Sequence, residues 1–147
     1  VVDGPRKKWR RGRAAAINFV PTSTGAAQAT TRVLPEHQGK FDGVAVRGPV
    51  PSGSMADMVL ITEANVSETQ INNLFREESQ SERYGGILGV SEDPLVSSDI
   101  IQDSRASVVD LTLTQVIDGD LLKVMSWYDN EWGYASQLIR EALRMAS

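Results

Sequence analysis

The sequence predicts an α+β fold, built mainly of antiparallel sheet with helices packed on one face. Strand-like runs with alternating apolar residues occur along much of the chain, and the turn signal Asp118-Gly119 joins two of them into a hairpin. Helical patterns stand between and after these runs. Long hairpins with helices on one face indicate an antiparallel α+β sandwich rather than a doubly wound sheet. With 147 residues and 41% hydrophobic composition, we expect one domain over residues 1–147.

The N-terminal third predicts a loop, an extended segment and a helix. Residues 1–13 combine Gly-Pro with dense positive charge, which is typical of an exposed loop. Pro21 favours an extended backbone before it. Either Ser23 or Thr24 is a good N-cap for a helix over 25–34, which Pro35 then ends.

Two strands and an amphipathic helix are expected next. The strands cover 43–50 and 54–64, with a Pro-Ser-Gly turn between them. The helix covers 67–82, with Ser67 as N-cap and Gln70 at the third helical position, a capping-box pattern. Its apolar stripe, which faces the core, consists of Ile71, Leu74 and Phe75.

The C-terminal third predicts strands at 86–90, 106–117 and 121–128, followed by a terminal helix over 132–147. In 106–117, Val109, Leu111 and Leu113 lie on one face of an extended chain, which predicts one continuous strand. The terminal helix places Tyr134, Leu138, Ile139 and Ala142 on one side.

Charge and composition exclude several classes of protein. Residues 1–13 hold six basic residues and one acid, whereas the whole chain has a net charge of −4, so the remainder is strongly acidic. That acidic body would repel phosphodiester backbones, and the basic segment has one aromatic residue, which disfavours nucleic-acid binding. No apolar run approaches membrane-spanning length, and nothing resembles a signal peptide. The absence of cysteine excludes a disulfide framework, a thiolate metal site and a cysteine nucleophile within these residues. We expect a cytoplasmic protein without a metal site.

Several phrases occur in a fixed order: VDGP, RRGRAAA, PTSTGAA, GILGVSEDPLVSSD and KVMSWYDNEWGY. Together they resemble the catalytic, C-terminal domain of phosphorylating glyceraldehyde-3-phosphate dehydrogenase, from Val2 to Ala146. The resemblance implies a two-domain enzyme with an NAD-binding Rossmann domain. It also implies a cysteine nucleophile and a histidine base, both upstream of the VDGP phrase. We therefore expect a fragment that lacks nucleophile, base and Rossmann domain and is inactive alone, divided into an inter-subunit loop (1–16), sheet and helices (17–131) and the terminal helix (132–147).

The resemblance assigns phosphate contacts to four residues. A helix N-terminus has unpaired N–H groups and partial positive charge, so Thr24 and Gly25 can hold an anion or can simply begin an ordinary capped helix. The resemblance implies that they bind inorganic phosphate. It assigns Arg47 to the substrate's C3 phosphate, although an arginine whose head reaches water is the alternative. Arg11 aligns near the same phosphate.

The motif YDNEWGY (residues 128–134) forms the corner between the last predicted strand and the terminal helix, and the resemblance assigns it to cofactor binding. Asp129 or Asn130 can cap the terminal helix, which would explain the motif structurally. The resemblance implies instead that Asn130 hydrogen-bonds the nicotinamide carboxamide of NAD and that Tyr134 lies beside the ring.

Other functions stay open at this point. A non-catalytic binding or assembly module could keep the same fold, and an erythrose-4-phosphate dehydrogenase would use the same scaffold. The single histidine, His37, follows a helix end and is expected to be an exposed surface residue. The resemblance further implies a homo-oligomer, and the apolar side of the terminal helix predicts self-association of the isolated chain.

Overall fold

The computed structural model describes residues 3–146, which form two compact units. One unit runs up to Pro51 and the other begins at Ser52. Val1, Val2 and Ser147, at the ends of the predicted loop and terminal helix, lie outside the described residues. The expectation of one domain over the whole chain stays a prediction.

The first unit is a two-stranded antiparallel ladder with short helices. Its elements are η1 (Trp9–Gly12), β1 (Val20–Ser23), α1 (Ala26–Val33), η2 (Pro35–His37) and β2 (Val44–Arg47). In the ladder Val20 lies opposite Arg47, and Ser23 lies opposite Val44. Among its described residues the buried apolar side chains are Ala14, Val20 and Ala27. Because so little of this unit is buried, hydrogen bonds and turn geometry carry much of its local conformation.

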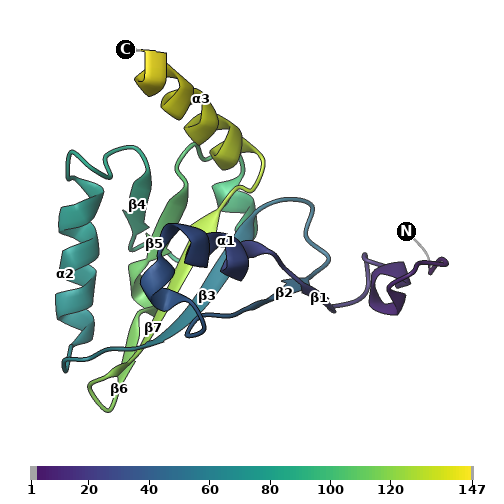
Figure 1. The fold of residues 1–147 in the computed structure, drawn as a ribbon, viewed down its shortest axis with the longest axis horizontal. Coiled ribbons are helices and arrows are strands. Elements are labelled where there is room, and N and C mark those ends of the chain that lie inside the picture. The colour runs from purple at the N-terminus through teal and green to yellow at the C-terminus, as the bar shows by residue number, and fades with distance from the viewer. Residues whose placement is uncertain (1–2, 147) are drawn as a thin grey trace. The chain divides into compact units, whose positions relative to one another are not determined.

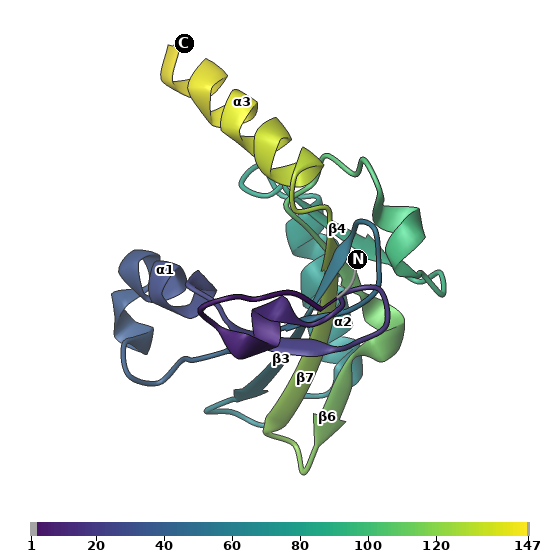
Figure 2. The same ribbon diagram turned by 90° about the vertical axis from the view of Figure 1, so that its right-hand side faces the viewer.

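The second unit contains a five-stranded sheet in the order β3-β7-β5-β4, with β6 also paired to β7 (Figures 1 and 2). All its pairs are antiparallel except β4 with β5. The elements are β3 (Ser54–Ile61), α2 (Glu68–Ser79), β4 (Leu88–Ser91), η3 (Ser97–Ile100), β5 (Ser107–Asp110), η4 (Leu111–Leu113), β6 (Gln115–Ile117), β7 (Leu121–Tyr128) and α3 (Trp132–Ala146). The α+β class is confirmed.

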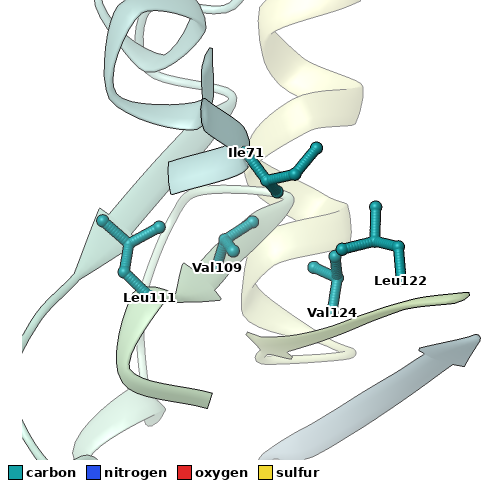
Figure 3. Packing of buried hydrophobic residues seen from close by; sticks show 5 residues of the cluster. All are labelled: Ile71, Val109, Leu111, Leu122 and Val124. Atoms are coloured by element: carbon teal, nitrogen blue, oxygen red, sulfur yellow. The ribbon is translucent and has the colours of Figure 1, made fainter. Parts of the chain in front are cut away.

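The core of this unit lies between α2 and the sheet (Figure 3). Its buried members are Ile71, Val109, Leu111, Leu122 and Val124. The predicted capping box begins α2: the Gln70 N–H donates to Ser67 Oγ at 3.3 Å, and the Ser67 N–H donates to Gln70 Oε1 at 2.9 Å. The start of α2 is thus set locally, and the burial of Ile71 fixes the helix on the sheet.

The predicted single strand over 106–117 is wrong, because η4 interrupts it between β5 and β6. Asp110 is 1% exposed, and its carboxylate needs donors. It accepts from the Thr112 N–H at 3.1 Å and the Thr112 hydroxyl at 2.6 Å, and also from Trp127 Nε1 at 3.0 Å. Thr112 reaches this carboxylate only if the chain turns after Asp110. The hydrogen bonds of Asp110 therefore prevail over the alternating pattern that favours a continuous strand.

The terminal helix α3 projects beyond the sheet, whereas α2 covers it (Figures 1 and 2). Its apolar side chains are largely exposed: Tyr134 70%, Leu138 58%, Ile139 62% and Leu143 67%. The helix therefore forms where it was predicted but does not add its apolar side to the core. No helix within residues 3–146 is both long and apolar enough to span a membrane.

Candidate phosphate and carboxamide sites

The start of α1 differs in detail from the prediction. The N-cap is Gly25 rather than Ser23 or Thr24, while the Thr24 hydroxyl accepts from the Ala26 N–H at 3.1 Å. Gly25 is exposed, has a φ of −91°, and would have nothing within 4 Å of an added Cβ. Neither packing nor a left-handed backbone requires glycine here. Its lack of a side chain leaves space beside the N-terminus of α1, where the Ala26 N–H is already bound by the Thr24 hydroxyl.

Arg47 is exposed and is the last residue of β2 rather than a mid-strand residue. Within residues 3–146 its side chain has no ion pair. The ladder places Arg47 opposite Val20, whereas Thr24 follows the other end of β1. Four residues of strand separate these positions, about 13 Å of backbone. The structure thus holds Thr24 and Arg47 on one hairpin but does not bring them together.

The arginine-rich loop closes on itself. Arg13 Nε donates to Asp3 Oδ2 at 3.1 Å, and the Gly4 N–H donates to the Gly12 carbonyl at 2.8 Å. A Cβ on Gly12 would lie 2.3 Å from the Gly4 carbonyl oxygen, so this approach requires glycine. Arg11, on η1, is exposed. No local pattern predicts that Asp3 holds Arg13, since the two are ten residues apart.

Asp129, rather than Asn130, caps α3. The buried Asp129 carboxylate accepts from the Glu131 N–H at 3.1 Å and the Trp132 N–H at 2.9 Å through Oδ1. Through Oδ2 it accepts from the Gln102 N–H at 2.9 Å. The Gln102 N–H, followed by that of Trp132, holds the pKa of Asp129 below its ordinary value of 3.8. The cap is therefore tied to a second loop.

Since Asp129 supplies the cap, Asn130 is free for another role. Asn130 is exposed, and its Nδ2 donates to both carboxylate oxygens of Glu131, at 3.0 and 2.9 Å. Its Oδ1 accepts from the Ser54 hydroxyl at the start of β3. Tyr134, one helical turn later, is 70% exposed. Sequence reasoning missed Ser54, because only the pairing of β3 with β7 brings it opposite Tyr128 and close to Asn130.

The sequence holds one histidine, His37, and no cysteine. His37 is exposed at the end of η2, as expected. Across residues 3–146, no three histidine, cysteine or acidic side chains gather closely enough to hold a metal ion. The sequence contains no cysteine to serve as a thiolate nucleophile. The chain thus presents candidate contacts for anions and for an amide ligand, and its sequence has no thiol.

Comparison with known proteins identifies the family. The profile described as "Glyceraldehyde 3-phosphate dehydrogenase, C-terminal domain" matches residues 1–130, and the chain belongs to this family. The glyceraldehyde-3-phosphate dehydrogenase of Mycobacterium tuberculosis is 50% identical over 137 residues, which are 93% of the chain and 40% of the relative. That of Haloarcula vallismortis is 48% identical over 139 residues, 95% of the chain and 41% of the relative. That of Borreliella burgdorferi is 44% identical over 146 residues, 99% of the chain and 44% of the relative. The chain thus spans about two fifths of the length of these relatives.

Proposed function

We propose that this chain is the ligand-binding part of an NAD-dependent, phosphorylating glyceraldehyde-3-phosphate dehydrogenase. This enzyme oxidises glyceraldehyde 3-phosphate with inorganic phosphate to 1,3-bisphosphoglycerate in glycolysis. The observation that carries the proposal is the family match over residues 1–130. No feature of the fold favours the alternatives, a non-catalytic module or an erythrose-4-phosphate dehydrogenase.

Inorganic phosphate is assigned to the start of α1. The open space around Gly25 and the hydroxyl of Thr24 support this, because an anion at a helix N-terminus gains from N–H donors and from the helix dipole. Packing does not require glycine at position 25, so the absence of a side chain there is consistent with a ligand occupying this space.

The substrate's own phosphate is assigned to Arg47, with Arg11 as a second cation. Arg47 suits this role because its guanidinium is exposed and can bind phosphate oxygens bidentately. Arg47 pairs with Val20, about 13 Å of strand before Thr24, which favours two phosphate positions rather than one. A reaction between a phosphorylated substrate and inorganic phosphate needs two such positions.

The nicotinamide is assigned to the corner between β7 and α3. The amide of Asn130 complements a carboxamide, and the exposed Tyr134 ring, in the first turn of α3, offers an apolar face. NAD as a whole is proposed to be held mainly by a Rossmann domain outside these residues. Hydride transfer is the chemistry of the cofactor, and the corner orients its reacting ring.

Because residues 1–147 contain no cysteine, we expect no dehydrogenase turnover from this chain alone. The nucleophile and base are proposed to belong to another part of the enzyme. We also propose that the enzyme is a homo-oligomer and that it is located in the cytoplasm.

A chimaera tests the proposal: these 147 residues replace the matching segment of the Mycobacterium tuberculosis relative, and phosphate-dependent NAD reduction is measured. We expect activity, with Arg47→Leu raising KM for glyceraldehyde 3-phosphate about 10-fold or more, since a charge-assisted hydrogen bond contributes about 1.5–3 kcal/mol. Gly25→Val should raise KM for phosphate. Gly43→Val is the matched control, because its Cβ also meets nothing within 4 Å. A folded chimaera that forms no NADH would overturn the proposal.

A further inference from the structure

The sequence contains three Asp-Gly pairs, and the structure holds them in different ways. They are Asp3-Gly4, Asp42-Gly43 and Asp118-Gly119. In such a pair the glycine nitrogen can attack the side-chain carbonyl carbon of the aspartate and close a cyclic imide, because glycine has no side chain to hinder the approach. Ring closure requires the carboxyl group and the glycine nitrogen to face each other. The hydrogen bonds and packing of each pair therefore decide how readily it reacts.

In Asp3-Gly4 both reacting groups are bound to other partners. The Asp3 carboxylate accepts from Arg13 Nε at 3.1 Å and from the Ala14 N–H at 2.7 Å. The Gly4 N–H donates to the Gly12 carbonyl at 2.8 Å. Both groups would have to leave these partners before the ring could close, so the closed loop protects this pair.

Asp118-Gly119 is held in the hairpin between β6 and β7. Both residues have positive φ, 52° and 84°. A Cβ on Gly119 would lie 3.1 Å from Asn65 Cγ, and the Gly119 carbonyl accepts from the Val66 N–H at 2.7 Å. The turn is thus fixed by its own conformation and by the segment that packs on it. Rotation of the backbone at this pair requires the hairpin to open.

Asp42-Gly43 lies in an exposed segment without regular structure, between η2 and β2. The Gly43 N–H donates to Asp42 Oδ1 at 2.7 Å, so the carboxyl group is turned toward the nitrogen that would attack it. A Cβ added to Gly43 would meet nothing within 4 Å, so the backbone has room to rotate. In this pair the two reacting groups already face each other, and no packing opposes the movement that joins them.

We propose that Asp42 is a site of spontaneous isoaspartate formation. The Gly43 nitrogen forms a bond to the side-chain carbonyl carbon of Asp42, and the carboxyl OH leaves with the amide hydrogen as water. Water then reopens the imide. Addition at the main-chain carbonyl breaks its bond to the Gly43 nitrogen, so the chain continues through the side-chain carbon and the old main-chain carbonyl becomes a carboxylate. Addition at the side-chain carbonyl restores aspartate. No oxidant or reductant takes part, and the mass of the final product is unchanged.

The product inserts one carbon into the backbone directly before β2. Val44, the next residue after Gly43, is already paired with Ser23 in the β1-β2 ladder. The extra carbon is therefore taken up in the exposed segment before the ladder. The isoaspartyl carboxylate formed there is open to solvent and is the group that an isoaspartyl methyltransferase recognises. This inference concerns the ageing of the chain and does not depend on the proposed dehydrogenase function.

The experiment incubates the 147-residue chain for several weeks in native buffer and, in parallel, in guanidinium chloride. Trypsin then releases residues 41–47 as one peptide, because Lys40 and Arg47 bound it. Isoaspartate in this and the other two Asp-Gly peptides is measured by mass spectrometry after chromatography and by methyl transfer from an isoaspartyl methyltransferase. In native buffer we expect about tenfold more isoaspartate at Asp42 than at either other pair, because those pairs react only after local opening. In guanidinium chloride the three pairs should react at similar rates.

Two variants test the chemistry of the site. Asp42→Glu keeps the charge but would need a larger ring, so the signal in 41–47 should vanish. Gly43→Ala should fold, since its Cβ meets nothing within 4 Å, and should slow the reaction several-fold because the methyl group hinders the attack. Similar isoaspartate levels at all three pairs in native buffer would overturn the proposal. So would modification at Asp3 or Asp118 that exceeds modification at Asp42, or an unmodified Asp42 in native buffer while the guanidinium sample reacts.

Discussion

Truncating Leu122 to alanine tests whether the core of the second unit is packed as described. Leu122 is 6% exposed on β7 and belongs to the cluster that includes Ile71 from α2 and Val109 from β5 (Figure 3). Three elements therefore surround the side chain, and none can move inward without disturbing the others. The vacated space would persist as a cavity.

The expected cost is about 3 kcal/mol, within the range of roughly 2–5 kcal/mol for such substitutions in cores. A typical domain is stable by about 5–15 kcal/mol, so a large share of the stability is lost. With a urea m value of about 1.5 kcal/mol/M, the midpoint of unfolding should fall by about 2 M.

Tryptophan fluorescence during urea unfolding is a suitable assay. Trp127 is half-buried and donates to Asp110, so its emission reports on the second unit. Trp9, in the first unit, is 90% exposed and should contribute little change. The matched control is Leu138→Ala on α3, where the side chain is 58% exposed and the expected change is within about 0.5 kcal/mol.

Two outcomes would refute this reasoning. A loss below about 1 kcal/mol in Leu122→Ala would mean that the site collapses and the core is not packed tightly. Equal losses in Leu122→Ala and Leu138→Ala would mean that the apolar side of α3 is covered in solution. In that case the unfolding midpoint should depend on protein concentration, as self-association through α3 predicts.

Three further predictions concern turns, caps and pH. Gly53→Ala should lower stability by more than about 1 kcal/mol in urea unfolding, because φ is +83° and the Ser97 carbonyl occupies the space; an unchanged midpoint would contradict it. Ser67→Ala should cost about 1 kcal/mol by removing the capping box with Gln70, while Ser67→Asp, which keeps a cap, should cost less. Asp129 has a lowered pKa when folded, so its stabilising contribution is complete above its ordinary value of 3.8 and is lost as pH falls from there toward the folded pKa. Acid titration followed by circular dichroism should show this loss, and Asp129→Asn should not show that part of the pH dependence.

The sequence predicted most elements that depend on local patterns. The capping box of α2 formed because Ser67 and Gln70 satisfy each other's backbone groups without help from elsewhere. The hairpin between β6 and β7 turns at Asp118 and Gly119, which both adopt positive φ, 52° and 84°. Asp tolerates that conformation and Gly favours it, so the turn is visible in two letters of sequence.

Predictions failed where a distant residue decided the outcome. Alternation over 106–117 favoured one strand, but the buried carboxylate of Asp110 took donors from Thr112 and Trp127, and η4 replaced the middle of the strand. The cap of α1 lies at Gly25 rather than at Ser23 or Thr24. The first of these shifts follows from the hydrogen bonds of a buried carboxylate, and the second is a one-residue difference at a helix end.

For the candidate sites, the sequence predicted which residues take part, whereas the structure showed how they are arranged. Thr24, Gly25, Arg47, Arg11, Asn130 and Tyr134 came from motifs in the sequence, and their roles stay proposals. The separation of Arg47 from Thr24 followed only from the register of β1 with β2. The sequence left Asp129 and Asn130 as alternative caps, and the structure shows Asp129 in that place, with its second carboxylate oxygen bound to the Gln102 N–H.

The sequence by itself determined the fold class, the family, most of the strands and helices, and the residues that make candidate ligand contacts, because each of these is encoded in short patterns of polarity, capping and turn residues. Only the tertiary structure decided how those residues are held. Ser54 and Asn130 are 76 positions apart, and strand pairing joins them. The apolar side of α3 illustrates the same limit, since its pattern marks the surface as apolar and the fold of residues 3–146 leaves it exposed. A hydrophobic stripe specifies that a surface is apolar, but the geometry of the surrounding elements decides what covers it.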